Sequence, residues 1–211
     1  MLTVRDITCV RGHRPLFAPA SFELAPGQAL HLQGDNGVGK TSLLRVICGL
    51  SPAHSGEVLW QDRPVREVAS SFRQSLFYLG HALSLKEELS ALENLLLDAA
   101  MAGRSLEAPQ ALQALRELGL QGREHLPVRV MSQGQKRRVA LARLSVSPAR
   151  LWVLDEPLVA LDVRALEQLR QRLARHVLGG GLLLLTSHQA LSLDLPDQPV
   201  PLRSLRLEVA R

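Results

Sequence analysis

The stretch Gly34-Asp35-Asn36-Gly37-Val38-Gly39-Lys40-Thr41 decides the fold of this chain. It matches the pattern G-x-x-x-x-G-K-[ST] in full, and it stands between a predicted strand at residues 29–32 and a predicted helix at residues 41–50. In this setting the glycines let several backbone N–H groups point inward, and the helix N-terminus adds a partial positive charge. The stretch therefore predicts a phosphate-binding loop within an α/β fold.

The chemistry of the loop indicates ATP bound with Mg²⁺. Lys40 is expected to reach the β- and γ-phosphates. The hydroxyl of Thr41 suits Mg²⁺, which binds one or two protein groups and leaves its other positions to phosphates and water. The candidate nucleotide-binding residues of the loop are Gly34, Asp35, Asn36, Gly37, Val38, Gly39, Lys40, Thr41 and Ser42.

Two acids follow an apolar run further along the chain. Residues 151–154 predict a buried strand, and Asp155 and Glu156 come directly after it. Two acids that close a strand are more commonly just exposed, but the phosphate-binding loop upstream favours a catalytic pair here. We expect Asp155 to hold the Mg²⁺ shell and Glu156 to orient and deprotonate the attacking water.

The pattern of the chain changes twice. Residues 3–10 and 21–32 alternate apolar and polar residues, as half-buried strands do, whereas residues 89–146 show helical spacing. Short apolar runs at 151–154 and 182–185 then indicate parallel strands covered on both faces. An amphipathic helix is expected between these two runs, at about residues 163–178. We predict one α/β domain over residues 1–211, with a β-rich opening and a helical insertion at about 82–147.

The composition limits the classes of function. A chain of 211 residues that is 46% hydrophobic suits a compact domain, and no apolar run approaches the roughly 20 residues of a membrane-spanning helix. The N-terminus does not read as a secretory signal. Cys9 and Cys48 lack metal-ligand spacing and are expected to be free thiols. The net charge of +5 comes mostly from scattered arginines, and only 3% of residues are aromatic, so no nucleic acid partner is expected.

Two further motifs narrow the class. Ser132-Gln133-Gly134-Gln135 precedes a basic amphipathic helical stretch at 136–144, and Thr186-Ser187-His188 follows the apolar run at 182–185. Taken alone, the first is more often an ordinary helix start, and a lone histidine is more often structural. Together with the loop and the two acids, these motifs resemble the nucleotide-binding domains of ABC transporters, in the family's order and over essentially the whole chain.

The resemblance implies the fold of a P-loop NTPase of the ABC ATPase type, with an N-terminal antiparallel β subdomain, and an enzyme that hydrolyses ATP. It also implies a head-to-tail dimer in which the signature of one copy closes over ATP held by the other. Ser132, Gly134 and Gln135 would then act on the second copy's nucleotide. By the same resemblance, His188 contacts the γ-phosphate and Asp162 reaches across the interface.

Several positions depart from the family pattern. Gln133 stands where the signature usually has glycine, and Val159 replaces the serine that is usual before the aspartate. Residues 10–13 lack the aromatic residue that usually stacks on adenine; Arg11 is a candidate for that contact, or simply a solvated turn residue. His81 stands where a glutamine usually links the Mg²⁺ site to the membrane partner, and a histidine changes its charge near neutral pH.

The Gly80-His81 step points to a narrower group. The segments that carry this resemblance are the phosphate-binding loop, Gly56-Glu57-Val58-Leu59-Trp60, Tyr78-Leu79-Gly80-His81, Leu89-Ser90-Ala91-Leu92-Glu93-Asn94-Leu95 and Ser187-His188-Gln189. Together they resemble the haem-exporter ATP-binding subunits of bacterial c-type cytochrome maturation, where the Gly-His step is usual. His81 is therefore a candidate catalytic residue beside Glu156 and His188.

This narrower resemblance implies a peripheral subunit on the cytoplasmic face of the inner membrane. Its implied partners are a second copy of itself and membrane-spanning, haem-handling permease subunits. No pattern indicates that the chain itself binds haem, because none of its unassigned histidines lies in an attachment motif. These histidines are His13, His31, His54, His125 and His176.

Two alternatives stay open. One is an ABC subunit that serves another exported substrate, such as a lipid, a peptide or a metal chelate. The other is a soluble ABC protein that acts on nucleic acid or ribosomes, although the second ATPase domain or long coiled coil usual in that class is missing. The motifs do not specify the transported species, the direction of transport, the coupling ratio or the role of residues 195–211.

Overall fold

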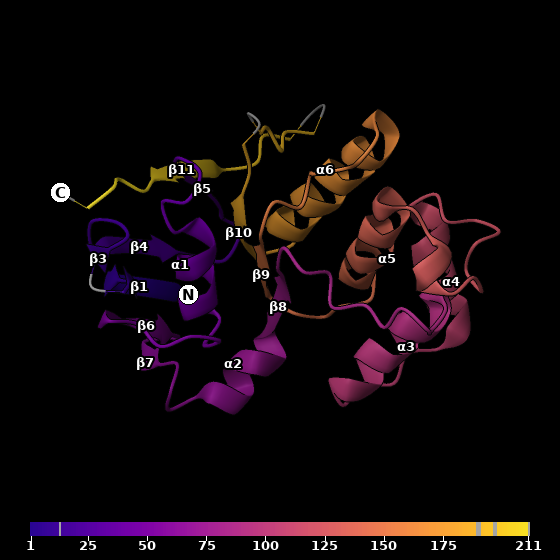
Figure 1. Cartoon of the computed structure of the whole chain (residues 1–211), viewed down its shortest axis with the longest axis horizontal. Helices are drawn as coiled ribbons and strands as arrows, with labels where there is room; N and C mark the ends of the chain where they lie inside the picture. Colours follow the sequence, from indigo (N-terminus) through magenta and orange to yellow (C-terminus); the bar gives the residue numbers. More distant parts are fainter. Residues whose placement is uncertain (13, 189–190, 196–197, 211) are drawn as a thin grey trace. The chain divides into compact units, whose positions relative to one another are not determined.

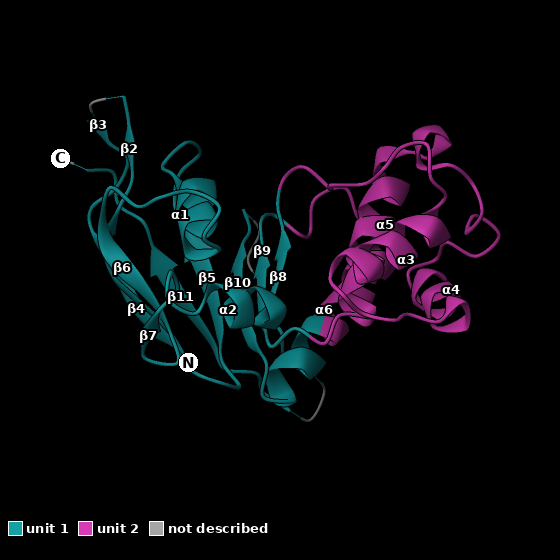
Figure 2. Cartoon of the chain, turned by 90° about the horizontal axis from the view of Figure 1, so that it is seen from below, with its two compact units in different colours: residues 1–80, 149–156, 173–211 teal, residues 81–148, 157–172 magenta. Residues whose placement is uncertain are grey.

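The computed structural model describes residues 1–12, 14–188, 191–195 and 198–210. The chain forms two compact units (Figure 2). Unit 1 comprises Met1–Gly80, Ala149–Glu156 and Leu173–Arg211, and unit 2 comprises His81–Pro148 and Pro157–Arg172. The range expected as a helical insertion falls in the first part of unit 2. Of the residues named above, His13 and Gln189 lie outside the described residues.

Unit 1 opens with an antiparallel sheet whose strand order is β4-β1-β6-β7. Its strands are β1 (Leu2–Thr8), β4 (Ala20–Leu24), β6 (Ser55–Trp60) and β7 (Arg63–Pro64). Buried and exposed residues alternate along β4, as expected of a strand with one face on the core. A short hairpin of β2 (Val10–Arg11) and β3 (Arg14–Pro15) follows β1. The antiparallel subdomain implied by the family resemblance is therefore present.

The alternating stretch at residues 21–32 is divided between two sheets. β4 ends at Leu24, and β5 (Ala29–Gln33) pairs in the second sheet of unit 1. Between them the N–H of Gln28 donates to the carbonyl of Ala25 at 3.2 Å, and Gly27 has φ of +77°. A turn this short leaves the alternation of residue types nearly unbroken, so the sequence pattern conceals the change of sheet.

The second sheet is parallel, with the strand order β11-β5-β10-β9-β8 (Figure 1). Its other strands are β8 (Leu76–Leu79), β9 (Leu151–Leu154), β10 (Leu182–Thr186) and β11 (Leu202–Arg206). Every residue of β9 and β10 is buried, in agreement with their continuous apolar sequences. Because all five strands run the same way, their carboxyl ends form one edge, and the phosphate-binding loop and the two acids follow strands at that edge.

Three helices precede or follow strands of unit 1 along the chain. α1 (Lys40–Ile47) ends before the predicted limit of residue 50, because Gly49 adopts φ of +68° after the helix. α2 (Ala69–Ser75) precedes β8, and α6 (Val163–Leu178) has the bounds expected from its spacing. Both cysteines are buried free thiols, as predicted, and burial raises the pKa of each.

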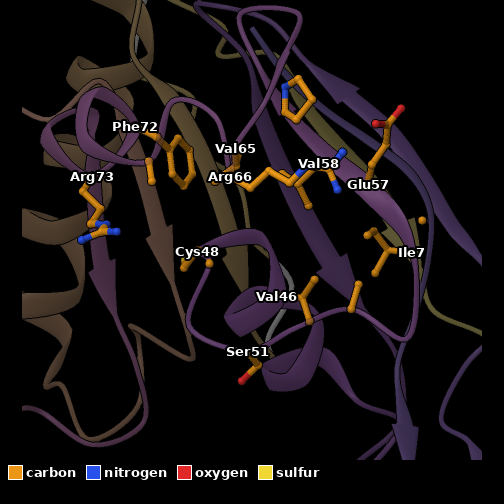
Figure 3. A pocket seen from close by; sticks show the side chains of 15 residues that line it. Ile7, Val46, Cys48, Ser51, Glu57, Val58, Val65, Arg66, Phe72 and Arg73 are labelled. Atoms are coloured by element: carbon orange, nitrogen blue, oxygen red, sulfur yellow. The ribbon is translucent and has the colours of Figure 1, made fainter.

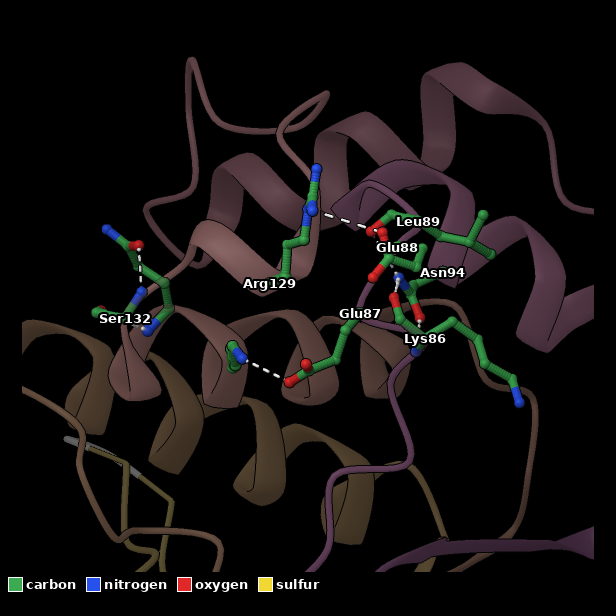
Figure 4. Close-up of polar contacts among 9 residues, drawn as sticks. Lys86, Glu87, Glu88, Leu89, Asn94, Arg129 and Ser132 are labelled. Atoms are coloured by element: carbon green, nitrogen blue, oxygen red, sulfur yellow. Dashed lines mark hydrogen bonds and ion pairs between the residues drawn. The ribbon is translucent and has the colours of Figure 1, made fainter.

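Unit 2 is helical, with α3 (Ala91–Met101), α4 (Ala108–Glu117), α5 (Gln133–Ser145) and a 3₁₀ turn at Val128–Val130. The buried side chain of Asn94 bonds the backbone N–H of Lys86 at 2.7 Å and its carbonyl at 3.0 Å (Figure 4). α5 was expected to be amphipathic, but residues 139–142 are all buried, so the helix is enclosed on more than one face. No helix in the described part of the chain is long and apolar enough to cross a membrane.

Candidate nucleotide-binding and catalytic site

The phosphate-binding loop joins β5 to α1 at the carboxyl edge of the parallel sheet. Gly34, Gly37 and Gly39 have φ of +147°, +80° and +110°, values that residues with a side chain rarely adopt. The Nζ atom of Lys40 donates to the carbonyl oxygens of Gly34 at 2.7 Å and Asp35 at 3.2 Å. The lysine is only 8% exposed, so its charge is held against the loop instead of in solvent.

Three side chains form a hydrogen-bonded chain beside the loop. The Thr41 hydroxyl donates to Oδ2 of Asp155 at 2.7 Å, and the Thr186 hydroxyl donates to Oδ1 of the same carboxylate at 2.8 Å. Thr41 lies in the first turn of α1, Asp155 follows β9, and Thr186 ends β10. The structure thus brings together the two residues predicted to bind Mg²⁺, which follow β5 and β9, the strands on either side of β10.

Thr186 was not among the predicted site residues. The available signal was its place directly before Ser187 and His188, at the end of a buried strand. Its hydroxyl also accepts a hydrogen bond from the backbone N–H of Glu156 at 2.9 Å. One buried hydroxyl therefore contacts both acids of the predicted catalytic pair.

Glu156 and His188 lie next to each other at the same edge. The Oε1 atom of Glu156 is 3.2 Å from Nε2 of His188, and the two side chains are 16% and 53% exposed. Glu156 has φ of +52°, an uncommon conformation for a residue with a side chain. Such backbone strain persists where the surroundings hold the residue, and it is concentrated at functional sites. The two predicted catalytic residues of unit 1 are thus in contact.

Tyr78 of β8 contributes a neutral polar group near these acids. Burial and the negative charge of Asp155 raise the pKa of its phenol to about 12, so the phenol is protonated at neutral pH. A Cβ on Gly80 would lie 2.8 Å from the Tyr78 hydroxyl oxygen, so the phenol lies directly against this glycine. His81 itself is exposed at the first position of unit 2, and its catalytic role stays a prediction.

The signature residues begin α5 within unit 2. Ser132 and Gln135 form a capping box: the Ser132 hydroxyl accepts from the Gln135 N–H at 3.3 Å, and Oε1 of Gln135 accepts from the Ser132 N–H at 3.0 Å. A Cβ on Gly134 would lie 3.1 Å from the carbonyl oxygen of Ala160, which leaves little room for a larger residue. The signature therefore packs beside the segment that leads to Asp162.

Asp162 has partners within its own unit. Its Oδ1 accepts from the N–H of Ala165 at 2.8 Å, at the start of α6, and its Oδ2 pairs with Arg138 of α5. The N–H of Ala165 and the charge of Arg138 hold the pKa of this carboxyl below its usual value. The aspartate thus joins α5 to the start of α6 and stays ionised at neutral pH.

Two of the unassigned histidines serve packing. Nε2 of His31 lies 3.0 Å from the carbonyl oxygen of Ser187. His176 stacks on Trp152 with ring centroids 3.7 Å apart and nearly parallel planes, and burial lowers its pKa. His54 and His125 are exposed. Among the described residues, no three His, Cys, Asp or Glu side chains gather as a metal-binding group.

A hollow of about 280 Å³ lies elsewhere in unit 1 (Figure 3). Its walls include Ile7, Val46, Val58 and Phe72, and none of the predicted site residues lines it. Arg11, the candidate for adenine stacking, is exposed on β2. That stacking contact stays a prediction.

Comparison with known proteins agrees with this geometry. The profile of the ABC transporter family matches residues 17–159. The cytochrome c biogenesis ATP-binding export protein CcmA of Nitrosomonas europaea is 48% identical over 191 residues, 90% of each chain. The protein of the same name from Dechloromonas aromatica is 48% identical over 207 residues, 98% of this chain and 100% of its own.

The fold agrees with solved structures as well. The dimeric ATP-binding cassette MJ0796, bound to ADP and Pi in a post-hydrolysis state, superposes with a TM-score of 0.82 at 22% identity, over 100% of this chain and 97% of its own. That similarity shows the fold of an ABC ATPase, as the family resemblance implied. The chain therefore belongs to the ABC transporter family, and within it to the group of ATP-binding export proteins of cytochrome c biogenesis.

Proposed function

We propose that this chain binds ATP with Mg²⁺ and hydrolyses it as the ATP-binding subunit of a haem-export complex in cytochrome c biogenesis. The observation that carries the proposal is the contact between Thr41, Asp155 and Thr186, which brings the phosphate-binding loop to the acidic end of β9. The group of relatives, named for ATP binding and export in cytochrome c biogenesis, supports the cellular role.

The loop is proposed to bind the phosphates. Lys40 is bonded to two loop carbonyls, and a phosphate oxygen would be a stronger partner for its ammonium group, because hydrogen bonds between charged groups are about twice as strong. Glycines let the loop backbone approach a phosphate closely, and Ser42 lies within the first turn of α1. Binding of ATP would therefore replace contacts within the loop by contacts to phosphate.

The donor set beside the loop fits Mg²⁺. A hydroxyl and a carboxylate, from Thr41 and Asp155, already lie within 2.7 Å of each other, and both are hard oxygen ligands. When bound, Mg²⁺ would neutralise charge on the β- and γ-phosphates. The second oxygen of Asp155 is held by Thr186, so one carboxylate oxygen is oriented while the other faces Thr41.

Glu156 is proposed as the general base that orients and deprotonates the attacking water. Its backbone is held by Thr186 and its side chain by His188, so the carboxylate is directed by two contacts. His188 is the more exposed of the pair and is proposed to contact the γ-phosphate. Catalysis of this kind depends mainly on positioning and charge stabilisation.

A second copy of the chain is proposed to complete the site. Ser132, Gly134 and Gln135 would approach ATP bound to the other copy, and Asp162 would contact the partner across the interface. The capping box at the start of α5 and the packing of Gly134 on Ala160 support this, because they preform the surface that would close. His81 is proposed to link the site to membrane-spanning, haem-handling permease subunits at the cytoplasmic face of the inner membrane.

Two measurements test the proposal. Lys40→Ala should lose ATP affinity, whereas Glu156→Gln should retain bound ATP and stop turnover. Equal turnover by Glu156→Gln and the parent would show that Glu156 is not the base.

Affinity purification of the tagged protein from detergent-solubilised membranes should recover haem-handling membrane subunits. The purified sample should also show a haem absorption spectrum. Recovery of an unrelated permease would discard haem, and recovery of ribosomes or nucleic acid alone would overturn the transport role.

A further inference from the structure

The glycines at the two ends of the phosphate-binding loop are each covered by a residue from outside the loop. A Cβ on Gly34 would lie 3.1 Å from the carbonyl oxygen of Leu207. A Cβ on Gly39 would lie 2.8 Å from Cδ1 of Phe17. Phe17 therefore lies closer to the loop than a side chain on Gly39 would permit, and Leu207 leaves little room for a side chain on Gly34.

These two covering residues are connected to each other. The backbone N–H of Ala18 donates to the carbonyl of Glu208 at 3.0 Å, and Phe17 forms an isolated antiparallel bridge with Val209. The N–H of Leu207 donates at 2.8 Å to the carbonyl of Gln33, the last residue of β5 before the loop. We call Phe17 and Ala18 together with residues 207–209 the loop clamp. It touches both ends of the loop and is joined by its own backbone hydrogen bond.

Burial shows which of these contacts matter. Phe17 is 0% exposed and Leu207 is 5% exposed, so both contacts exclude water. An ion pair between Arg206 and Asp35, at 3.2 Å, also joins β11 to the loop, but its side chains are 69% and 75% exposed. Exposed ion pairs contribute little because water screens them. The buried contacts of the clamp therefore dominate over this surface pair.

We propose that the loop clamp is a positioning element that holds the phosphate-binding loop in its binding conformation before ATP arrives. A loop with glycines at three positive φ values has many accessible conformations, and ordering it on binding would cost conformational entropy. When only a fraction of the molecules has the loop in its ATP-binding conformation, the apparent dissociation constant for ATP equals the intrinsic constant divided by that fraction. The proposal assigns a role to the C-terminal residues and rests on the proposed binding of ATP.

The test uses the full chain and two ways of loosening the clamp. Phe17→Leu replaces the ring that covers Gly39 by a smaller aliphatic side chain. A chain that ends after Leu207 removes the backbone partners of Phe17 and Ala18. Phe72→Leu is the matched control, because Phe72 is 1% exposed and packs edge-on against Trp60, outside the loop. Dissociation constants for MgATP and MgADP are measured by calorimetry, and kcat and KM by phosphate release, at a temperature where every variant is folded.

Both clamp variants should bind ATP and ADP about tenfold more weakly, with a matching rise in KM and a change in kcat below about twofold. Phe72→Leu should bind like the parent. Parental affinity in both clamp variants, or an equal loss in Phe72→Leu, would overturn the inference. Lys40→Ala separates the two proposals. If Lys40→Ala binds ATP as tightly as the parent, the proposal that ATP binds at this loop is wrong. If Lys40→Ala loses ATP affinity and the clamp variants do not, only the role of the loop clamp is wrong.

Discussion

Replacement of Thr186 by valine tests whether the two acids are held by one hydroxyl. The change keeps the shape of the side chain and removes its oxygen. Asp155 then loses a donor 2.8 Å from Oδ1, and the N–H of Glu156 loses its acceptor at 2.9 Å. Thr186 is 0% exposed, so water cannot easily replace either contact.

The magnitude follows from these two contacts. A buried donor left without an acceptor costs about 1–3 kcal/mol, and a hydrogen bond to a charged carboxylate contributes about 1.5–3 kcal/mol. Because the two contacts share one oxygen, we expect a loss of about 2–4 kcal/mol in the free energy of unfolding, less than the total stability of a typical domain. Glu156 holds a strained φ of +52°, and without Thr186 its backbone is free to relax. A shift of about 1 Å in a catalytic group can lower the rate about 100-fold.

The assay combines denaturant unfolding with steady-state ATP hydrolysis. Thr186→Val should lower kcat by about 10- to 100-fold and leave KM for ATP within about threefold, since the contacts of Lys40 are untouched. Thr186→Ser, which keeps the oxygen, should recover most of kcat. Thr3→Val, at a buried threonine of β1, is the matched control and should retain parental kcat. Parental kcat in Thr186→Val would refute the reasoning.

Two further predictions concern titration and backbone geometry. Burial lowers the pKa of His176 in the folded state, so the unfolded chain binds a proton at a higher pH than the folded chain does. The contribution of His176 to the free energy of unfolding should therefore be complete above the unfolded pKa of about 6.5 and decrease as the pH falls below it. Urea unfolding at pH 5 and 7 should show a smaller loss of stability at pH 5 for His176→Phe than for the parent. Gly56→Ala should lower the free energy of unfolding by more than about 2 kcal/mol, since its Cβ would lie 2.4 Å from the carbonyl oxygen of Arg5; a thermal melt like that of the parent would contradict it.

Much of the fold could be read from residue pattern because local chemistry sets it. The loop at residues 34–41 requires a strand before it and a helix after it, and both are present as β5 and α1. The bounds of α6 followed from its spacing alone. The alternation of apolar and polar residues did not reveal the change of sheet within residues 21–32, because a four-residue turn leaves the alternation intact. The spacing of apolar residues did not predict how fully α5 is buried, because that burial depends on neighbouring elements.

The sequence by itself predicted the chemistry. The phosphate-binding loop is a contiguous motif whose residue types indicate its role, and the two acids, the signature and the histidine are interpreted through their occurrence with it in the family's order. Only the tertiary structure decided which residues hold them in place. Thr186 meets Asp155 across 31 positions of sequence, and Leu207 meets the loop from the far end of the chain. Such contacts depend on strand order in the parallel sheet, where β10 lies between β9 and β5 and β11 lies beside β5. Strand order is set by the packing of whole elements, and no local pattern of residues records it.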